Sequence, residues 1–490
     1  MQSKEKIRGV QLIMGYWGFI IMLSGFITLL PLLVLFAYPE EFTHAKCFYI
    51  PGIIAIFVGY ALTLLIRGKG KGIFRQHQEA VILLGAWFFA ILIAALPFMI
   101  SGNYNLAQSV FESTSGFTTT GMTIVNPDST PKLFLMHRSL TMFFGGVGLM
   151  LVLMSVLSDS MGMRLYNAEG HKDRLLPNLI RSARLLFSIY SGYIIAGMLI
   201  YRGLGMSWFD SLNHSISVYA TGGFSTRSGG IGSYNSLPIE IATMVFMLLG
   251  AVNFVMHLYL LRGKFKTFMS HCENKFTVFL IALFVPLIAF ISVNSIYNTF
   301  SESFRFAFFN VIATFTTTGI SAGAPLSAYA APVIFLMILL MFIGGSSEST
   351  AGAIKQYRVW VALKALWWDL RDRFSNKRVV RANLINRFGK IEALTPQETR
   401  GTLAFIMWYV GIALIGTFIF MLFGNPLQNS LFEFASALGN VGFSTGITNY
   451  YAHPIILWTG TIGMFIGRLE IMIVFMGLGS IISSVKRRLD

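Results

Sequence analysis

A five-residue pattern occurs four times in the chain, and a second pattern follows each copy. The first motif has Thr or Asn, any residue, Gly, a bulky apolar residue and Ser or Thr. It reads TTGMT (119–123), TGGFS (221–225), TTGIS (317–321) and NVGFS (440–444). The second motif reads MFFGGVG (142–148), MLLGAVN (247–253), MFIGGSS (341–347) and MFIGRLE (464–470). Because 24 to 27 residues separate the central glycine of the first motif from the first glycine of the second, the chain contains an internal repeat.

Composition restricts the class of protein. Of 490 residues, 55% are hydrophobic and 12% charged, with a mean hydropathy of +0.66, and many apolar runs are long enough to cross a bilayer. The net charge of +16 arises from basic residues between apolar runs, which argues against nucleic acid as a partner. No acid-base or metal-ligand cluster stands out in the sequence, so we expect no enzyme and no organic cofactor. These features predict an all-α polytopic protein in a lipid bilayer.

The apolar runs predict five segments of chain. Residues 1–76 hold two leading transmembrane helices. Four units follow, and in each a spanning run precedes a short apolar run ending in the first motif, after which a second spanning run carries the second motif. This arrangement predicts ten spans. The units cover 77–183, 184–274, 275–399 and 400–490.

Basic residues predict the orientation. Lys and Arg gather in the loops between units and at the C-terminus, whereas 101–131 contains neither. By the positive-inside rule, both termini are cytoplasmic and the four first motifs face outward. Each unit crosses twice and returns to the same side, so the units are parallel copies that can surround an axis normal to the membrane.

A short run that enters the membrane and ends in a glycine suits a cation pathway. Irregular backbone at membrane depth is tolerated only when buried in protein or lining a water-filled path. Short helices would point their carbonyl ends at the axis, and glycine would permit the positive φ that lets successive carbonyls aim inward. Four such segments would form the rings of carbonyl oxygens that replace the water shell of K⁺. The alternative, small residues serving close helix packing, fits one motif better than four in register.

The second motif differs between units. In the fourth unit it carries Arg468, near mid-membrane, where a charge is costly and usually faces the bundle interior. There it would repel a permeant cation; the alternative is a structural contact with Glu348 or a neighbouring carbonyl. Glu470, two residues away, is expected to face elsewhere. In the third unit the motif opens into GGSSESTAGAIK (344–355), which predicts a break in the helix that lines the pathway.

Over its whole length the chain resembles the TrkH-type subunit of the Trk/Ktr/HKT superfamily of cation uptake proteins. The resemblance implies four fused M1-P-M2 repeats, like those of potassium channels, around a central pore, with two extra leading helices. It implies K⁺ as the permeant ion, because plant relatives that carry Na⁺ have serine where this chain has Gly121. The implied K⁺-binding residues are Thr120, Gly222, Thr318 and Val441. Asn440 replaces threonine, so the ring at its level cannot be uniform. The implied selectivity filter comprises Thr119, Thr120, Gly121, Thr221, Gly222, Gly223, Thr317, Thr318, Gly319, Asn440, Val441 and Gly442.

The family also has a flexible gating loop below the filter and an arginine matching Arg468. This implies a gate in which Glu348 pairs with Arg468 when closed, and which serine and alanine make stiffer than in glycine-rich relatives. The gate residues are Gly344, Gly345, Ser346, Ser347, Glu348, Gly352, Lys355 and Arg468. The remaining alternative is a K⁺ symporter coupled to H⁺ or Na⁺, for which Glu348 and Glu470 are the obvious intramembrane carboxylates.

Relatives form homodimers on a ring of cytoplasmic nucleotide-binding subunits of the RCK (TrkA-like) type, in the bacterial inner membrane. Segments 160–183 and 367–399 are the expected contacts, although 367–399 could equally be a solvated loop that sets topology. Polar residues nine positions before each filter glycine would tie the short helices to their neighbours or tune the field at the filter; they are Glu112, His214, Asn310 and Glu433. Arg227 is expected at the outer mouth in a structural role.

Overall fold

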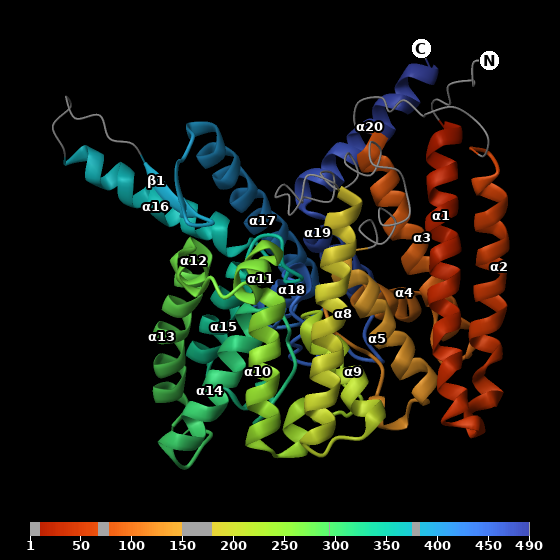
Figure 1. Cartoon of the computed structure of the whole chain (residues 1–490), viewed down its shortest axis with the longest axis horizontal. Coiled ribbons are helices and arrows are strands. Elements are labelled where there is room, and N and C mark those ends of the chain that lie inside the picture. Colours follow the sequence, from red (N-terminus) through yellow and green to blue (C-terminus); the bar gives the residue numbers. More distant parts are fainter. Residues whose placement is uncertain (1–9, 67–77, 149–178, 294, 375–382, 490) are drawn as a thin grey trace.

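The computed structural model describes residues 10–66, 78–148, 179–293, 295–374 and 383–489. The chain begins with α1 (Val10–Leu29), which continues into a 3₁₀ segment (Leu30–Phe36), and with α2 (Lys46–Thr63). These two helices form a close pair at one side of the molecule (Figure 1). Their backbones approach at Gly18 and Gly59, where a Cβ on either glycine would crowd the carbonyl oxygen of the other.

A succession of a long helix, a shorter helix and a returning helix then occurs four times. The long helices are α3 (Gln78–Ile100), α8 (Leu179–Gly203), α13 (Cys272–Ser292) and α17 (Pro396–Leu422). The short helices are α4 (Leu106–Phe117), α9 (Trp208–Tyr219), α14 (Phe300–Phe315) and α18 (Leu427–Leu438). The returning helices are α5 (Lys132–Val147), α10 (Leu237–Ala251), α15 (Ala331–Ile343) and α19 (Pro454–Leu469). Further helices are α11 (Phe254–Leu261), α12 (Phe265–Ser270), α16 (Gln356–Arg373) and α20 (Ile471–Leu489).

The expectation of an all-α polytopic fold is confirmed. Six described helices are long and apolar enough to cross a membrane: the two leading helices and the four long ones. The count reaches eight when two bent pairs are included, α10 with α11 at 116° and α19 with α20 at 102°. The apolar runs predict ten spans, and six, or eight with the bent pairs, are found among the described residues. Of the returning helices, α5 and α15 are too short to count and α10 and α19 are bent.

The second motif marks the end of every returning helix. Helices α5, α10, α15 and α19 stop at Val147, Ala251, Ile343 and Leu469, each within that motif. The sequence predicted such a break only in the third unit. The first glycine of the second motif permits close packing in three of the units. A Cβ on Gly145, Gly250 or Gly467 would overlap the last carbonyl oxygen of the short helix beside it.

One end of the molecule carries the start of α1, the end of α20 and an arm made by α16 (Figure 1). The segment 367–399, expected as a charged loop, contains the end of α16 and a two-stranded hairpin of β1 (Leu384–Arg387) and β2 (Lys390–Ala393). The hairpin packs through Ile385 against Val361, Trp368 and Cys272. Residues 67–77, 149–178 and 375–382, which include most of the expected contact 160–183, lie outside the described residues.

Candidate functional site

The four first motifs meet in a closed ring. A Cβ added to Gly121 would overlap the carbonyl oxygen of Gly222, and one on Gly223 would overlap that of Thr318. The same holds for Gly319 against Val441, and for Gly442 against Thr120, which returns to the first motif. The four carbonyls that the resemblance implies as ligands therefore each lie against the glycine of a neighbouring motif. Only glycine leaves room for this approach.

All four motifs share the conformation of their first residue and one backbone hydrogen bond. Thr119, Thr221, Thr317 and Asn440, the first residues, have φ between 52° and 54°, a left-handed conformation that is uncommon outside glycine. The residue before each filter glycine donates its N–H to a carbonyl five residues back in the short helix, as in Thr120 to Ser115 (2.9 Å) and Val441 to Ser436 (2.8 Å). These N–H groups point back to the short helices, and the carbonyl oxygens of the same residues face the neighbouring motif.

Asn440 departs from the ring in its side chain and not in its backbone. Its Nδ2 donates to Oγ1 of Thr120 (3.0 Å) and to the carbonyl of Met464 (2.9 Å). Its Oδ1 is buried without a hydrogen-bond partner. The expected loss of fourfold uniformity thus concerns only the side chains at this level.

Three of the four polar residues nine positions before the filter glycines hold the chain that leaves the ring. Glu112 accepts from the Thr123 hydroxyl (2.8 Å), the His214 ring contacts the Ser225 hydroxyl (3.0 Å), and Glu433 accepts from the Ser444 hydroxyl (2.7 Å). The partner is each time the last residue of the first motif, which accounts for the hydroxyl at that position in three of the four motifs. The fourth, Asn310, instead donates to the Tyr329 hydroxyl (2.9 Å). These contacts agree with a role in tying helices to their neighbours.

Sequence reasoning missed Arg138, which lies on α5 and is buried beside the ring. Its Nε donates to Glu112 (2.8 Å), another nitrogen donates to Thr123 (2.9 Å), and the guanidinium lies 3.9 Å from the ring centre of Phe224. A charged residue in the middle of a returning run was the signal that could have identified it.

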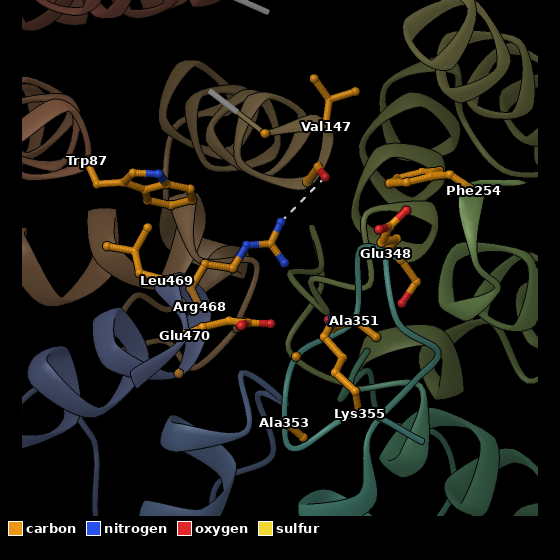
Figure 2. A pocket seen from close by; sticks show the side chains of 15 residues that line it. Trp87, Val147, Phe254, Glu348, Ala351, Ala353, Lys355, Arg468, Leu469 and Glu470 are labelled. Atoms are coloured by element: carbon orange, nitrogen blue, oxygen red, sulfur yellow. Dashed lines mark hydrogen bonds between the residues drawn. The ribbon is translucent and has the colours of Figure 1, made fainter. Parts of the chain in front are cut away.

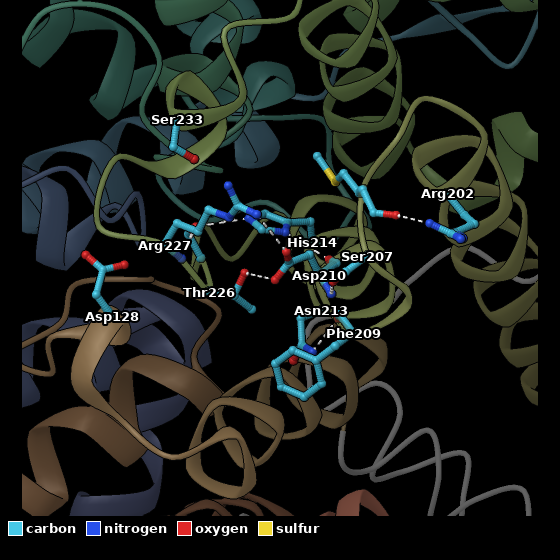
Figure 3. Close-up of polar contacts among 12 residues, drawn as sticks. Asp128, Arg202, Ser207, Phe209, Asp210, Asn213, His214, Thr226, Arg227 and Ser233 are labelled. Atoms are coloured by element: carbon cyan, nitrogen blue, oxygen red, sulfur yellow. Dashed lines mark hydrogen bonds and ion pairs between the residues drawn. The ribbon is translucent and has the colours of Figure 1, made fainter. Parts of the chain in front are cut away.

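A cavity of about 570 Å³, here called the vestibule, lies on the side of the ring where the chain leaves each first motif. It is lined by the four filter glycines, by Arg138 and by Arg227. Arg227 pairs with Asp210 (3.2 Å), which also accepts from the Thr226 hydroxyl (2.6 Å), as Figure 3 shows. Arg227 therefore lies at the vestibule in a hydrogen-bonded cluster.

On the opposite side of the ring the helix break expected over 344–355 is present. The segment is not helical, and Gly344, Glu348, Ala353 and Lys355 have positive φ. It lies directly against the ring, because Gly352 donates its N–H to the Thr317 hydroxyl (2.9 Å) and the Thr221 hydroxyl donates to Thr350 (3.0 Å).

The loop-side cavity, about 70 Å³, lies next to this segment and is lined by Glu348, Lys355, Arg468 and Glu470 among others (Figure 2). Arg468 donates to the carbonyls of Thr350 and of Gly145 (2.6 Å to the latter), so it joins segment 344–355 to the end of α5. Contrary to the expectation from helical spacing, Glu470 lines the same cavity, because α19 ends at Leu469. Glu470 is bound by Arg358 at 2.9 Å.

Comparison with known proteins supplies the family. The TrkH model, described as a cation transport protein, matches residues 44–478. An uncharacterized cation transporter of Methanocaldococcus jannaschii is 30% identical over 96% of this chain and 95% of its own length. The Trk system potassium uptake protein TrkG of Escherichia coli is 29% identical over 94% of this chain and 96% of its own.

A crystal structure shows that the fold is shared as well. The potassium transporter TrkH of Vibrio parahaemolyticus superposes with a TM-score of 0.82, covering 96% of this chain and 97% of its own, at 23% identity. The resemblance inferred from the two repeated motifs is thereby confirmed. The chain belongs to the TrkH family of cation transport proteins.

Proposed function

We propose that this chain takes up K⁺ across the bacterial cytoplasmic membrane through a selectivity filter built from the four first motifs. The observation that carries the proposal is the closed ring in which Thr120, Gly222, Thr318 and Val441 place their carbonyls against neighbouring glycines. Rings of carbonyl oxygens substitute for the hydration shell of K⁺. The relatives named as Trk system potassium uptake proteins match nearly the whole chain, which supports the same ion here.

In this proposal the four units 77–183, 184–274, 275–399 and 400–490 surround the pathway as M1-P-M2 repeats, and 1–76 lies beside them. The vestibule faces outward and both termini face the cytoplasm, as the distribution of Lys and Arg predicts. K⁺ is the permeant ion, and the carbonyls of Thr120, Gly222, Thr318 and Val441 bind it.

The gate in this proposal consists of Arg468 and segment 344–355. One water molecule needs about 10–15 Å³ of cavity volume, so the loop-side cavity of about 70 Å³ has room for about five to seven water molecules. The vestibule is several times larger. The arginine would stand in the cation path, and moving segment 344–355 would widen it. The pairing of Glu348 with Arg468 stays a prediction.

The contacts of Glu470 favour gated permeation over symport coupled at that residue. A symporter would need an intramembrane carboxylate that exchanges its proton or its Na⁺ during each cycle. Glu470 is held by two hydrogen bonds from Arg358 (2.9 and 3.0 Å), which satisfy a charged carboxylate and oppose such an exchange.

Partners form part of the proposal. A homodimer resting on a ring of nucleotide-binding subunits would meet the end of the molecule that carries α16 and the hairpin. The charged residues of 367–399 support this placement, and the family resemblance supplies the class of partner.

The first test is uptake of ⁸⁶Rb⁺ into liposomes that contain the purified protein, with K⁺ or Na⁺ as competitor. We expect K⁺ to compete and Na⁺ not to compete. Gly121→Ser should lose this discrimination, because its side chain would displace the carbonyl of Gly222. A matched control is Gly102→Ser, whose Cβ would meet no atom within 4 Å. Equal competition by Na⁺ in the wild type, or unchanged selectivity in Gly121→Ser, would contradict the filter.

A further inference from the structure

The hairpin at the end of the molecule has an unexpected residue in its turn. Strands β1 and β2 pair from Leu384–Ala393 to Arg387–Lys390, which leaves Phe388 and Gly389 as a two-residue turn. Both have positive φ, 52° and 78°, as a type I′ turn requires. Asn-Gly suits such a turn, whereas a left-handed phenylalanine costs about 1–2 kcal/mol. The turn itself therefore does not favour phenylalanine, and a contact made by the ring of Phe388 must offset the cost.

That contact is His271, in the connection between α12 and α13. The two rings are stacked with centres 5.0 Å apart and an angle of 18° between their planes. The N–H of Phe388 also donates to Nδ1 of His271 (3.2 Å). Since a backbone N–H can only donate, Nδ1 is the acceptor, and the ring proton resides on Nε2. Nε2 then donates to Oε2 of Glu273 (3.1 Å).

Glu273 completes the connection to segment 344–355. It lies in the first turn of α13 and is 1% exposed, as is His271. Its other oxygen, Oε1, accepts the N–H of Ser347 (2.7 Å). Ser347 directly precedes Glu348, which has positive φ and lines the loop-side cavity. One continuous chain of hydrogen bonds thus runs from the turn of the hairpin to the segment beside the ring.

We propose that His271 and Glu273 are positioning residues that couple the hairpin to segment 344–355, so that displacing the hairpin from His271 releases Ser347. Burial alone would explain why the imidazole and the carboxylate have partners. It does not explain a phenylalanine at a position that favours asparagine or glycine, stacked on the first member of the chain. The consequence for ion flux depends on the proposed function of segment 344–355 as a gate, whereas the coupling itself does not.

Phe388→Asn tests the coupling without breaking the hairpin. Asparagine suits the turn better than phenylalanine and removes only the stacked ring. Amide hydrogen exchange of the full-length protein in lipid nanodiscs should show exchange at Ser347 rising several-fold. The matched control is Ile391→Ala, on the same hairpin but 69% exposed, which should leave Ser347 unchanged. Unchanged exchange at Ser347 in Phe388→Asn would overturn the coupling.

Glu273→Gln tests the direction of the hydrogen bonds. The amide oxygen of glutamine can still accept from Ser347, but its NH₂ must now donate to Nε2 of His271. The ring proton then moves to Nδ1, which can no longer accept from Phe388. Because the proposed coupling makes Ser347 depend on the contact between the hairpin and His271, we expect exchange to rise several-fold at Phe388 and, to a smaller extent, at Ser347. Faster exchange at Ser347 with none at Phe388 would contradict the assigned chain.

Uptake of ⁸⁶Rb⁺ separates this inference from the proposed function. If Phe388→Asn raises both exchange at Ser347 and uptake, coupling and gate are both supported. If exchange rises while uptake stays the same, the coupling holds and the gate role of segment 344–355 fails.

Discussion

The two sides of the ring are built differently. On the vestibule side, Glu112, His214 and Glu433 each bind the last residue of a first motif, and an arginine buried next to Glu112 adds further contacts. On the loop side, segment 344–355 rests on the ring with three non-glycine residues, Glu348, Ala353 and Lys355, at positive φ. Residues in this conformation cost on the order of 1–3 kcal/mol each and persist only where neighbours impose it.

Under the proposed function, this difference assigns two tasks to the two sides of one pathway. Selection among ions requires carbonyls at fixed positions, and buried, satisfied hydrogen bonds supply that rigidity. Opening requires a segment whose alternative conformation lies close in free energy, and backbone strain reduces that gap. The first motifs also contain left-handed residues, but the buried hydrogen bonds on the vestibule side hold the chain that leaves them. Changes on the vestibule side should therefore alter selectivity or stability, and changes on the loop side should alter the rate of uptake.

The largest effect is expected from Arg138→Met. It leaves Glu112 buried without its guanidinium, and breaking a buried pair in this way typically costs about 3–5 kcal/mol. We expect a lower thermal midpoint and loss of K⁺ selectivity, measured by unfolding in detergent and by ⁸⁶Rb⁺ uptake. The double variant Arg138→Met/Glu112→Gln removes the unpaired charge and should recover part of the stability. No recovery would mean that the arginine acts through Phe224 rather than through Glu112.

Glu433→Gln tests a second buried carboxylate on the vestibule side. Both oxygens of Glu433 accept hydrogen bonds, including those from the N–H groups of Thr445 (2.7 Å) and Thr448 (3.0 Å). An NH₂ group in place of either oxygen faces one of these backbone N–H groups, which then has no acceptor. Each buried donor left without an acceptor costs about 1–3 kcal/mol. We expect discrimination against Na⁺ to fall several-fold in the competition assay. Asn310→Ala is the control, since that side chain binds Tyr329 and not the last residue of its motif; an equal loss there would weaken the comparison.

Arg468→Ala tests the loop side. A unit charge about 10 Å from a cation, at an effective dielectric constant of about 20, opposes it by about 1.7 kcal/mol. Removing the charge should raise ⁸⁶Rb⁺ uptake about tenfold with selectivity unchanged. Arg468→Lys keeps the charge but cannot reach the carbonyls of both Thr350 and Gly145 as the forked guanidinium does. If the charge is the barrier, uptake in the lysine variant stays at the wild-type level. If the bridge between the carbonyls closes the path, uptake rises as in Arg468→Ala. Unchanged uptake in both variants excludes both roles.

The repeated motifs allowed the architecture and the ring to be predicted from sequence. Gly121 and its three equivalents recur in register, and a glycine that recurs at one spacing indicates a shared backbone requirement. The break at 344–355 was also predictable, because polar and small residues interrupt an apolar run there. The breaks in the other returning helices were not, since α10 and α19 continue as apolar sequence through Asn253 and Glu470.

Contacts between distant segments were the part that sequence could not supply. Arg138 joins Glu112 and Phe224, and Phe388 meets His271, only because tertiary packing brings their helices and loops together. The chain also bends at Glu470, and Arg468 and Glu470 therefore line the same cavity. On a straight helix, two residues at this spacing would face different sides. Pattern reasoning gives faces of single helices, whereas these roles depend on which elements pack against each other.

The smallest effect is expected from Asp128→Asn, outside the membrane-spanning helices at the edge of the vestibule (Figure 3). Hydrogen bonds from the Ser228 hydroxyl and N–H hold the pKa of Asp128 below its ordinary value. Because the pKa is lower in the folded protein, the charged carboxylate stabilises the fold at pH values above its ordinary pKa of about 4. This contribution is lost as the pH falls through the lower, folded-state pKa. Between pH 5 and 8 the group stays charged, so uptake should not change with pH on its account.

The side chain is exposed, so the contact contributes little, and asparagine still offers an oxygen to Ser228. We therefore expect Asp128→Asn to keep ⁸⁶Rb⁺ uptake and K⁺ selectivity within about twofold of the wild type. A large loss of selectivity would show that exposed contacts between the loops, and not the buried ones at Glu112 and Glu433, fix the ring. That result would reverse the distinction between the rigid vestibule side and the strained loop side.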